Sequence, residues 1–126
     1  MTLRNALFGL ALSLFGLAGC SPNVCSGNSC ACPSGASCDF GDRSSATSSF
    51  SCASGATCSG KTGANSSVEC GGASCTVTVG AGSTVNCSAG TCNITCTGAC
   101  TTQCISGGTC NLTCQGGTTQ SAAGCS

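Results

Sequence analysis

Apolar and polar residues alternate along much of this chain with a period of two. At positions 75, 77 and 79, cysteine and valine side chains alternate with threonines. The same alternation recurs at 92–96 and 110–114, where cysteines flank one large aliphatic residue. A period of two is typical of β-strands that bury one face. The pattern therefore predicts an all-β protein.

A second, shorter strand is predicted before each of these strands. It shows the same alternation in pairs such as Val68 with Cys70 and Val85 with Cys87. Glycine-containing turns separate the strands, as at 80–82, 98–99 and 116–117. One repeat is thus two strands and two turns.

The repeat becomes clear when the cysteines are aligned. A short loop of small residues between two cysteines recurs at 32–38, 52–58, 70–75, 87–92 and 104–110, and the leading cysteines are 20, 18, 17 and 17 residues apart. Stacking these units places one set of residues in a column: Phe40, Gly60, Val77, Ile94 and Leu112. The arrangement predicts a disulfide-rich, parallel β-helix-like solenoid with about 17–18 residues per coil. Residues 32–126 form this Cys-rich repeat domain, and they resemble Cys-rich β-solenoid repeat proteins in general.

Incomplete copies of the repeat are predicted at both ends of the domain. Residues 118–125 are expected to form a sixth, degenerate copy, with Ser121 in a cysteine position, and residues 25–30 a shortened one. A terminal unit that departs from the pattern is typical of a capped repeat array.

Disulfides are expected to replace much of the usual apolar core. From Cys20 onward the chain has only ten large aliphatic or aromatic residues, too few to order a domain of this size by burial alone. Both cysteines of a loop should point inward at the ends of a tight turn, within reach of each other. We therefore expect local bridges: Cys25–Cys30, Cys32–Cys38, Cys52–Cys58, Cys70–Cys75, Cys87–Cys92 and Cys104–Cys110. Four cysteines remain, most simply joined as Cys96–Cys100 and Cys114–Cys125, with their other pairings open.

The N-terminal segment has the composition of a signal peptide. Arg4 precedes an apolar run that extends to Ala18 and is shorter than the roughly 20 residues of a membrane span. The run ends in Leu17-Ala18-Gly19-Cys20, which resembles the bacterial lipobox, in which the cysteine thiol is acylated and becomes the mature N-terminus. Removing Cys20 from seventeen cysteines leaves sixteen, an even number that can pair completely. The alternative is an ordinary secretory signal that is cut after Cys20.

This resemblance implies a division of the chain and a location. Residues 1–19 would be a lipoprotein signal peptide, and residues 20–31 a lipid-anchor linker with an N-terminal cap. Ser21 follows the lipidated position, which in similar families favours the outer membrane. The protein is thus expected in the bacterial cell envelope, held to the membrane by lipid at its periplasmic or surface face.

The composition argues against catalysis and cofactor binding. The chain has no histidine, tyrosine or tryptophan, so a serine or cysteine nucleophile would have no imidazole to activate it. No Cys-x-x-Cys occurs, and structural zinc sites usually need such close spacing. The rival interpretation as a metal-thiolate protein is therefore weak. We expect no enzyme, no cofactor, no metal and, without a basic patch, no nucleic acid partner.

One surface remains as a candidate binding site. If the central column points inward, two columns of polar residues point outward: Thr76, Asn93 and Asn111 in one, and Thr78, Thr95 and Thr113 in the other. The array resembles the Thr-x-Thr faces of small disulfide-rich β-solenoid antifreeze proteins. Threonine and asparagine are also ordinary residues for an outward strand face. We expect a rigid structural or adhesive envelope module that contacts a protein or glycan, or alternatively an ice-binding or carbohydrate-surface-binding module.

The covalent state of the mature protein tests the first part of this interpretation. We expect the native mass to include lipid on Cys20 and to show no alkylation of thiols before reduction. After reduction, sixteen thiols should react, because all cysteines other than Cys20 would be paired in the native protein. Intact-mass spectrometry with and without reductant measures both. Free thiols in the native protein would contradict the disulfide core.

Overall fold

The structure is a computed structural model that describes residues 25–126 except 73, 116–119 and 122. The predicted signal peptide, and residues 20–24 of the predicted linker with Cys20, lie outside the described residues. The described part contains eleven strands and no helix. The strands are β1 (Cys25–Ser26), β2 (Ser29–Cys32), β3 (Ser37–Arg43), β4 (Ser49–Cys52), β5 (Thr57–Thr62), β6 (Ser67–Gly71), β7 (Ser74–Val79), β8 (Ser83–Cys96), β9 (Cys100–Cys114), β10 (Gln120–Ser121) and β11 (Gly124–Cys125).

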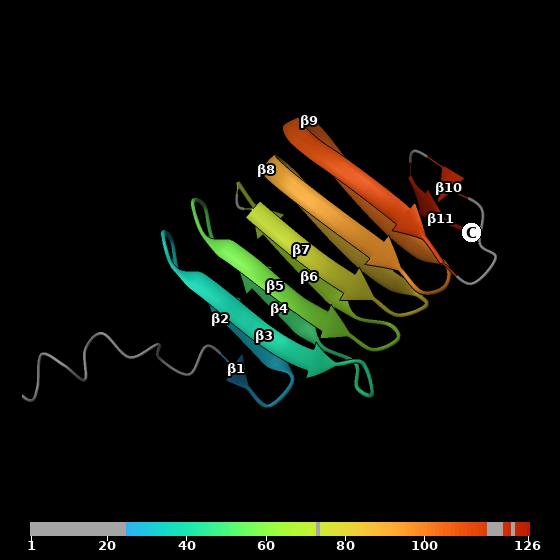
Figure 1. Ribbon diagram of the computed structural model, residues 1–126, viewed down its shortest axis with the longest axis horizontal. Helices are drawn as coiled ribbons and strands as arrows, with labels where there is room; N and C mark the ends of the chain where they lie inside the picture. Colours follow the sequence, from blue (N-terminus) through green and yellow to red (C-terminus); the bar gives the residue numbers. More distant parts are fainter. Residues whose placement is uncertain (1–24, 73, 116–119, 122) are drawn as a thin grey trace, which may run out of the picture.

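The strands form a two-layered β-solenoid, which confirms the predicted fold (Figure 1). The first layer consists of β2, β4, β6, residues 83–88 of β8 and residues 100–105 of β9. The second layer consists of β3, β5, β7 and the later halves of β8 and β9. All of these strands pair in parallel with the equivalent strand of the next rung. Each rung therefore repeats the path of the one before it.

Parallel register places chemically equivalent residues over one another. One cysteine column lies in the first layer, at Cys32, Cys52, Cys70, Cys87 and Cys104. A second lies in the second layer, at Cys38, Cys58, Cys75, Cys92 and Cys110. Five disulfides join the two columns across the loop at each rung. We call this stack of bridges the disulfide ladder.

The predicted apolar column also forms, with one irregularity at its start. Gly60, Val77, Ile94 and Leu112 lie in register, and β3 shifts its register between Asp39 and Asp42. Phe40 lies within this shift and packs on Phe50 from the first layer, with ring centroids 4.6 Å apart. Both rings are buried. They fill the volume that Val77 and Ile94 fill in later rungs, so Gly60 has no room for a side chain.

A column of buried serines supports the corner opposite the disulfide ladder. Ser48, Ser66 and Ser83 are buried there at successive rungs. The Ser48 backbone N–H donates to the Ser66 Oγ (2.9 Å), and the Ser66 N–H donates to the Ser83 Oγ (3.0 Å). Hydroxyls thus satisfy backbone donors that the tight turn would otherwise leave buried without a partner. At the next rung Cys100 pairs in register with Ser83 and forms a bridge to Cys96.

The ends of the solenoid differ from the expected extra repeats. The described rungs number five, not six, because the terminal strands β10 and β11 form an antiparallel hairpin on β9. Likewise β1 pairs antiparallel with β2, so residues 25–30 form a hairpin and not a shortened parallel rung. At Gly124 an added Cβ would overlap the Cys100 carbonyl oxygen, which explains the glycine in β11. The two hairpins are caps, and both lie on the first layer.

Substitution of Gly60 tests its close packing against the two phenylalanine side chains. An added Cβ would lie 2.9 Å from Phe50 Cε2 and 3.0 Å from Phe40 Cβ. Gly60→Ala is therefore expected to reduce the free energy of unfolding by about 1–3 kcal/mol through overpacking. Thermal unfolding followed by circular dichroism measures the change. Gly71→Ala is the control, because its Cβ would make only an ordinary contact of 3.7 Å with the Cys52 carbonyl oxygen. Equal stability of the two variants would contradict this packing.

Thr62 offers a test of the buried corner. Its side chain is buried, in the position that Val79 takes at the next rung, and its Oγ1 has no hydrogen-bond partner. Thr62→Val is expected to raise the free energy of unfolding by about 1 kcal/mol, because it replaces an unpaired hydroxyl with a methyl group of similar size. Thr62→Ser, which keeps the hydroxyl, should not stabilise. Denaturant titration measures both, and a less stable valine variant would show that the hydroxyl has a partner.

Candidate functional site

The six predicted surface residues lie together on the outward side of the second layer. Thr76, Asn93 and Asn111 are in register on neighbouring strands, and all three are exposed. Thr78, Thr95 and Thr113 form the next column, in which Thr78 and Thr95 are half-buried and Thr113 is exposed. Neighbouring strands of a sheet lie about 4.8 Å apart, so each column repeats at that interval.

A third column, which the sequence prediction missed, extends this array toward the disulfide ladder. It consists of Thr57, Ser74, Thr91 and Thr109, which are in register and exposed. The period-two alternation contained the signal, because these positions lie two residues before the predicted ones. The prediction began each strand at its cysteine and therefore left these residues to the loops. We call the three columns together the polar array.

Contacts between rungs fix some side chains of the polar array. The Asn111 Nδ2 donates a hydrogen bond to the Asn93 Oδ1 at 2.9 Å, although both residues are exposed. The bond orders two side chains that would otherwise move freely, which reduces the entropy lost on binding a partner. The array is thus partly organised before any contact is made.

The charged residues of the second layer lie at one margin of it, in its first two strands. Asp39, Asp42 and Lys61 line a shallow hollow that also includes Thr76 and Thr78. Hydrogen bonds from the Ser44 side chain and backbone N–H lower the pKa of the Asp42 carboxyl. The Asp39 Oδ1 accepts the Gly41 N–H at 2.9 Å. Both carboxylates stabilise turns at the end of the first rung, and the later three rungs of the array consist of neutral residues.

The outward side of the first layer is less uniform. It carries serines and threonines as well, but Glu69 interrupts them and accepts a hydrogen bond from the Asn86 Nδ2 at 2.6 Å. Gln103 and the exposed Ile105 occupy outward positions in its last rung. The polar array is therefore the more regular of the two faces, and we treat it as the candidate site.

The structure joins all sixteen cysteines from Cys25 onward as eight disulfides, in the pairs that we expected. They are Cys25–Cys30, Cys32–Cys38, Cys52–Cys58, Cys70–Cys75, Cys87–Cys92, Cys96–Cys100, Cys104–Cys110 and Cys114–Cys125. Seven join cysteines that are four to six positions apart in the sequence, and the eighth ties the C-terminal cap to the last rung. The C-terminal cap on the first layer is thus covalently held to the second-layer strand that ends in Cys114.

Sulfur atoms of neighbouring bridges approach one another closely. In the described part of the chain, three groups of three Sγ atoms lie within 4.8 Å of one another, for example those of Cys52, Cys58 and Cys75. Every one of these sulfurs is already part of a disulfide. A disulfide sulfur is not a thiolate ligand, so the proximity follows from the stacking of the ladder.

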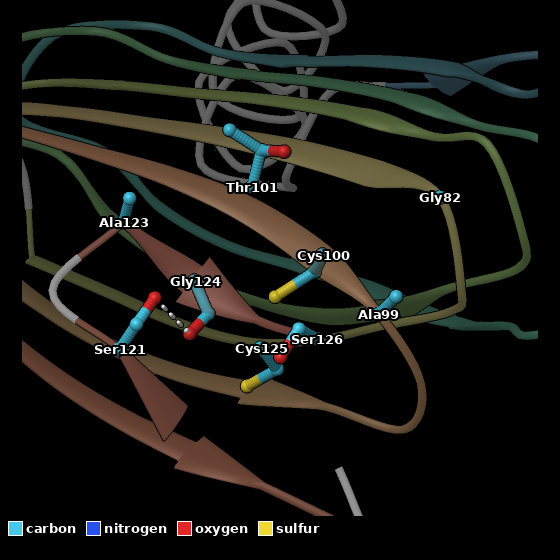
Figure 2. Close-up of a pocket in the computed structure, with 9 residues that line it drawn as sticks. All are labelled: Gly82, Ala99, Cys100, Thr101, Ser121, Ala123, Gly124, Cys125 and Ser126. Carbon is cyan, nitrogen blue, oxygen red and sulfur yellow. Dashed lines mark hydrogen bonds between the residues drawn. The ribbon is translucent and has the colours of Figure 1, made fainter. Parts of the chain in front are cut away.

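A further hollow lies beside the C-terminal cap (Figure 2). Backbone and small side chains of Gly82, Ala99, Thr101 and Ala123 line it, with the disulfide-bonded Cys100 and Cys125. The Ser121 hydroxyl donates to the Gly124 carbonyl oxygen at 3.3 Å within the hairpin. These contacts hold the cap, and these side chains offer no acid or base for catalysis.

Comparisons with protein-family models, with curated proteins and with solved structures find no match to this chain. Within the described residues, no helix is long and apolar enough to cross a membrane. The chemistry of the polar array therefore carries the functional argument.

Proposed function

We propose that this protein is a rigid, non-catalytic module of the bacterial cell envelope that adheres to a repetitive polar surface. The observation that carries the proposal is the polar array, in which three columns of neutral polar residues repeat in register on neighbouring strands. Each residue makes a weak contact. A partner that repeats at a similar spacing would engage many of them at once, and such contacts combine as in multivalent binding.

The rigidity of the scaffold supports this function. Five stacked bridges close one corner of the solenoid, and buried serines hydrogen-bond the backbone at the other. Hydrogen bonds between rungs continue through the turns, as from the Thr57 N–H to the Ala36 carbonyl oxygen at 2.8 Å. A face that is ordered before binding loses little conformational entropy when it binds.

The residues available for chemistry also support a non-catalytic role. The carboxylates are Asp39, Asp42 and Glu69, and all three are exposed. General acids and bases usually owe their tuned pKa to burial or to a close charged partner. Asp42 has its pKa lowered by hydrogen bonds from Ser44, which suits a turn carboxylate.

The proposed location rests on the N-terminal sequence. The segment Leu17-Ala18-Gly19-Cys20 resembles a lipobox, so lipid on Cys20 would hold the module to the outer membrane, with Ser21 favouring that membrane. The first described strand, β1, follows this segment in the sequence and lies at one end of the rod (Figure 1). The rungs would then extend away from the attachment point and present their sides to the surroundings.

A specific observation favours a second candidate function, binding to ice or to an ordered polysaccharide. Two of the three columns consist only of threonine and serine in the last three rungs, at Ser74, Thr91 and Thr109 and at Thr78, Thr95 and Thr113. Such side chains combine a methyl or methylene group with one hydroxyl, which suits a flat lattice of oxygen atoms. The regularity of these columns is the feature that distinguishes this candidate from a general adhesive face.

Paired lysine substitutions on the two faces test the proposed function. Ser74→Lys with Thr76→Lys places two large cations within the polar array, and binding to isolated envelope, to insoluble glycan and to ice should weaken by about tenfold or more. Sedimentation with each solid, and ice recrystallisation assays, measure the binding.

The matched control is Ser51→Lys with Ser67→Lys. These residues are exposed on the first layer, so the variant adds the same charge outside the array. The control should bind as the unmodified protein does. Equal binding by both variants, or no binding of the unmodified protein to any of the three surfaces, would overturn the proposal. Retention on one surface alone would identify the partner class.

A further inference from the structure

The five bridges of the disulfide ladder differ sharply in exposure. The cysteines of the first four rungs are buried, with at most 7% of any residue exposed. At the fifth rung Cys104 is exposed and Cys110 is half-buried. This bridge is also the most exposed of all eight, since every other bridge contains at least one buried cysteine.

The exposure follows from where the C-terminal cap ends. The strand β11 pairs with Cys100 and Thr101 at the start of β9 and does not reach Cys104. In the second layer, no described strand pairs with β9 on the side away from β8. The ladder therefore has no covering strand at its last rung, among the described residues.

The loop that this bridge closes is also open to solvent. Ile105, next to Cys104, is 54% exposed. At Gly107 an added Cβ would meet no atom within 4 Å. Because Cys104 is itself exposed, an incoming nucleophile can reach this bridge, whereas the other bridges of the ladder are buried.

We propose that the Cys104–Cys110 disulfide is a site of thiol–disulfide exchange, at which an external thiolate becomes covalently linked to Cys104. The attacking thiolate bonds to the Cys104 Sγ, and the bond between the Cys104 and Cys110 sulfurs breaks. Its electron pair leaves on the Cys110 Sγ as a thiolate. One disulfide replaces another, so the step needs no oxidant or reductant beyond the thiolate itself.

The reverse step is built into the same rung. The Cys110 thiolate stays within the loop beside the new mixed disulfide, so it can attack the Cys104 Sγ, release the external thiol and restore the original bridge. The buried bridges hold the remaining rungs during this cycle. The site lies at the end of the rod opposite β1, where it is available to a small thiol or to a cysteine of another protein (Figure 1).

Thiol trapping on the native full chain tests this proposal. The protein is incubated with reduced glutathione or with a small folded protein that carries one engineered surface cysteine, quenched with an alkylating reagent and mapped by peptide mass. We expect a mixed disulfide on Cys104 and alkylation of Cys110, at least about tenfold faster than at any other bridge. Reaction with glutathione alone would support exchange with small thiols only, and reaction with both would include protein thiols.

Two double variants separate exchange from general unfolding. Cys104→Ser with Cys110→Ser should abolish the fast reaction and keep the β-sheet circular dichroism, because the last rung contributes least to the buried core. Cys52→Ser with Cys58→Ser removes a buried bridge of the same sequence separation, six residues, and should retain the fast reaction. Three results would each overturn the proposal: another bridge reacts with the thiol before Cys104–Cys110 does, the thiol is found on Cys110, or all bridges are reduced at the same time.

Discussion

Parallel, in-register pairing between successive rungs is the constraint on which the rest of this structure depends. Backbone hydrogen bonds require each strand to lie directly over its equivalent in the neighbouring rung. Equivalent positions of neighbouring rungs therefore lie next to one another, and they tend to hold the same type of residue. Cysteines stack into a ladder, aliphatic residues into a narrow core, and serines into a hydrogen-bonded corner. The outward columns of threonine and asparagine result from the same in-register pairing.

Most of the fold could be predicted from the repeat period, because in a β-solenoid the spacing of residues in the sequence determines which residues lie in register. The disulfide pairs followed from the same spacing, since loop ends such as Cys87 and Cys92 are neighbours in any such coil. The ends could not be predicted in this way. The antiparallel pairing of β1 with β2 and of β11 with β9 depends on tight local contacts, such as that of Gly124 on Cys100. Alignment with the repeats does not reveal these contacts. The buried role of Ser66 was also hidden, because serine in a loop usually indicates an exposed turn.

The candidate site was predicted in part for a related reason. Its central columns, at Thr76 and Thr78, alternate with large apolar residues and were visible as outward positions. The third column, with Thr57 and Thr91, was missed because its inward neighbours lie next to the loops, where alternation no longer distinguishes strand from turn. The order of the Asn93 and Asn111 amides depends on a contact between rungs that no single repeat contains.

The placement of both caps on one layer limits how these molecules can associate. A free strand edge is a template on which further strands can add, and uncapped β-solenoids would be expected to join end to end into fibres. Here the first layer is closed by an antiparallel strand at each end, while the edges of β3 and of residues 109–114 stay unpaired among the described strands. A second rod meeting either end would encounter the protruding hairpin before both layers could continue their hydrogen bonding. The hairpins thus prevent end-to-end addition of further rods, and each solenoid keeps the length that its own rungs give it.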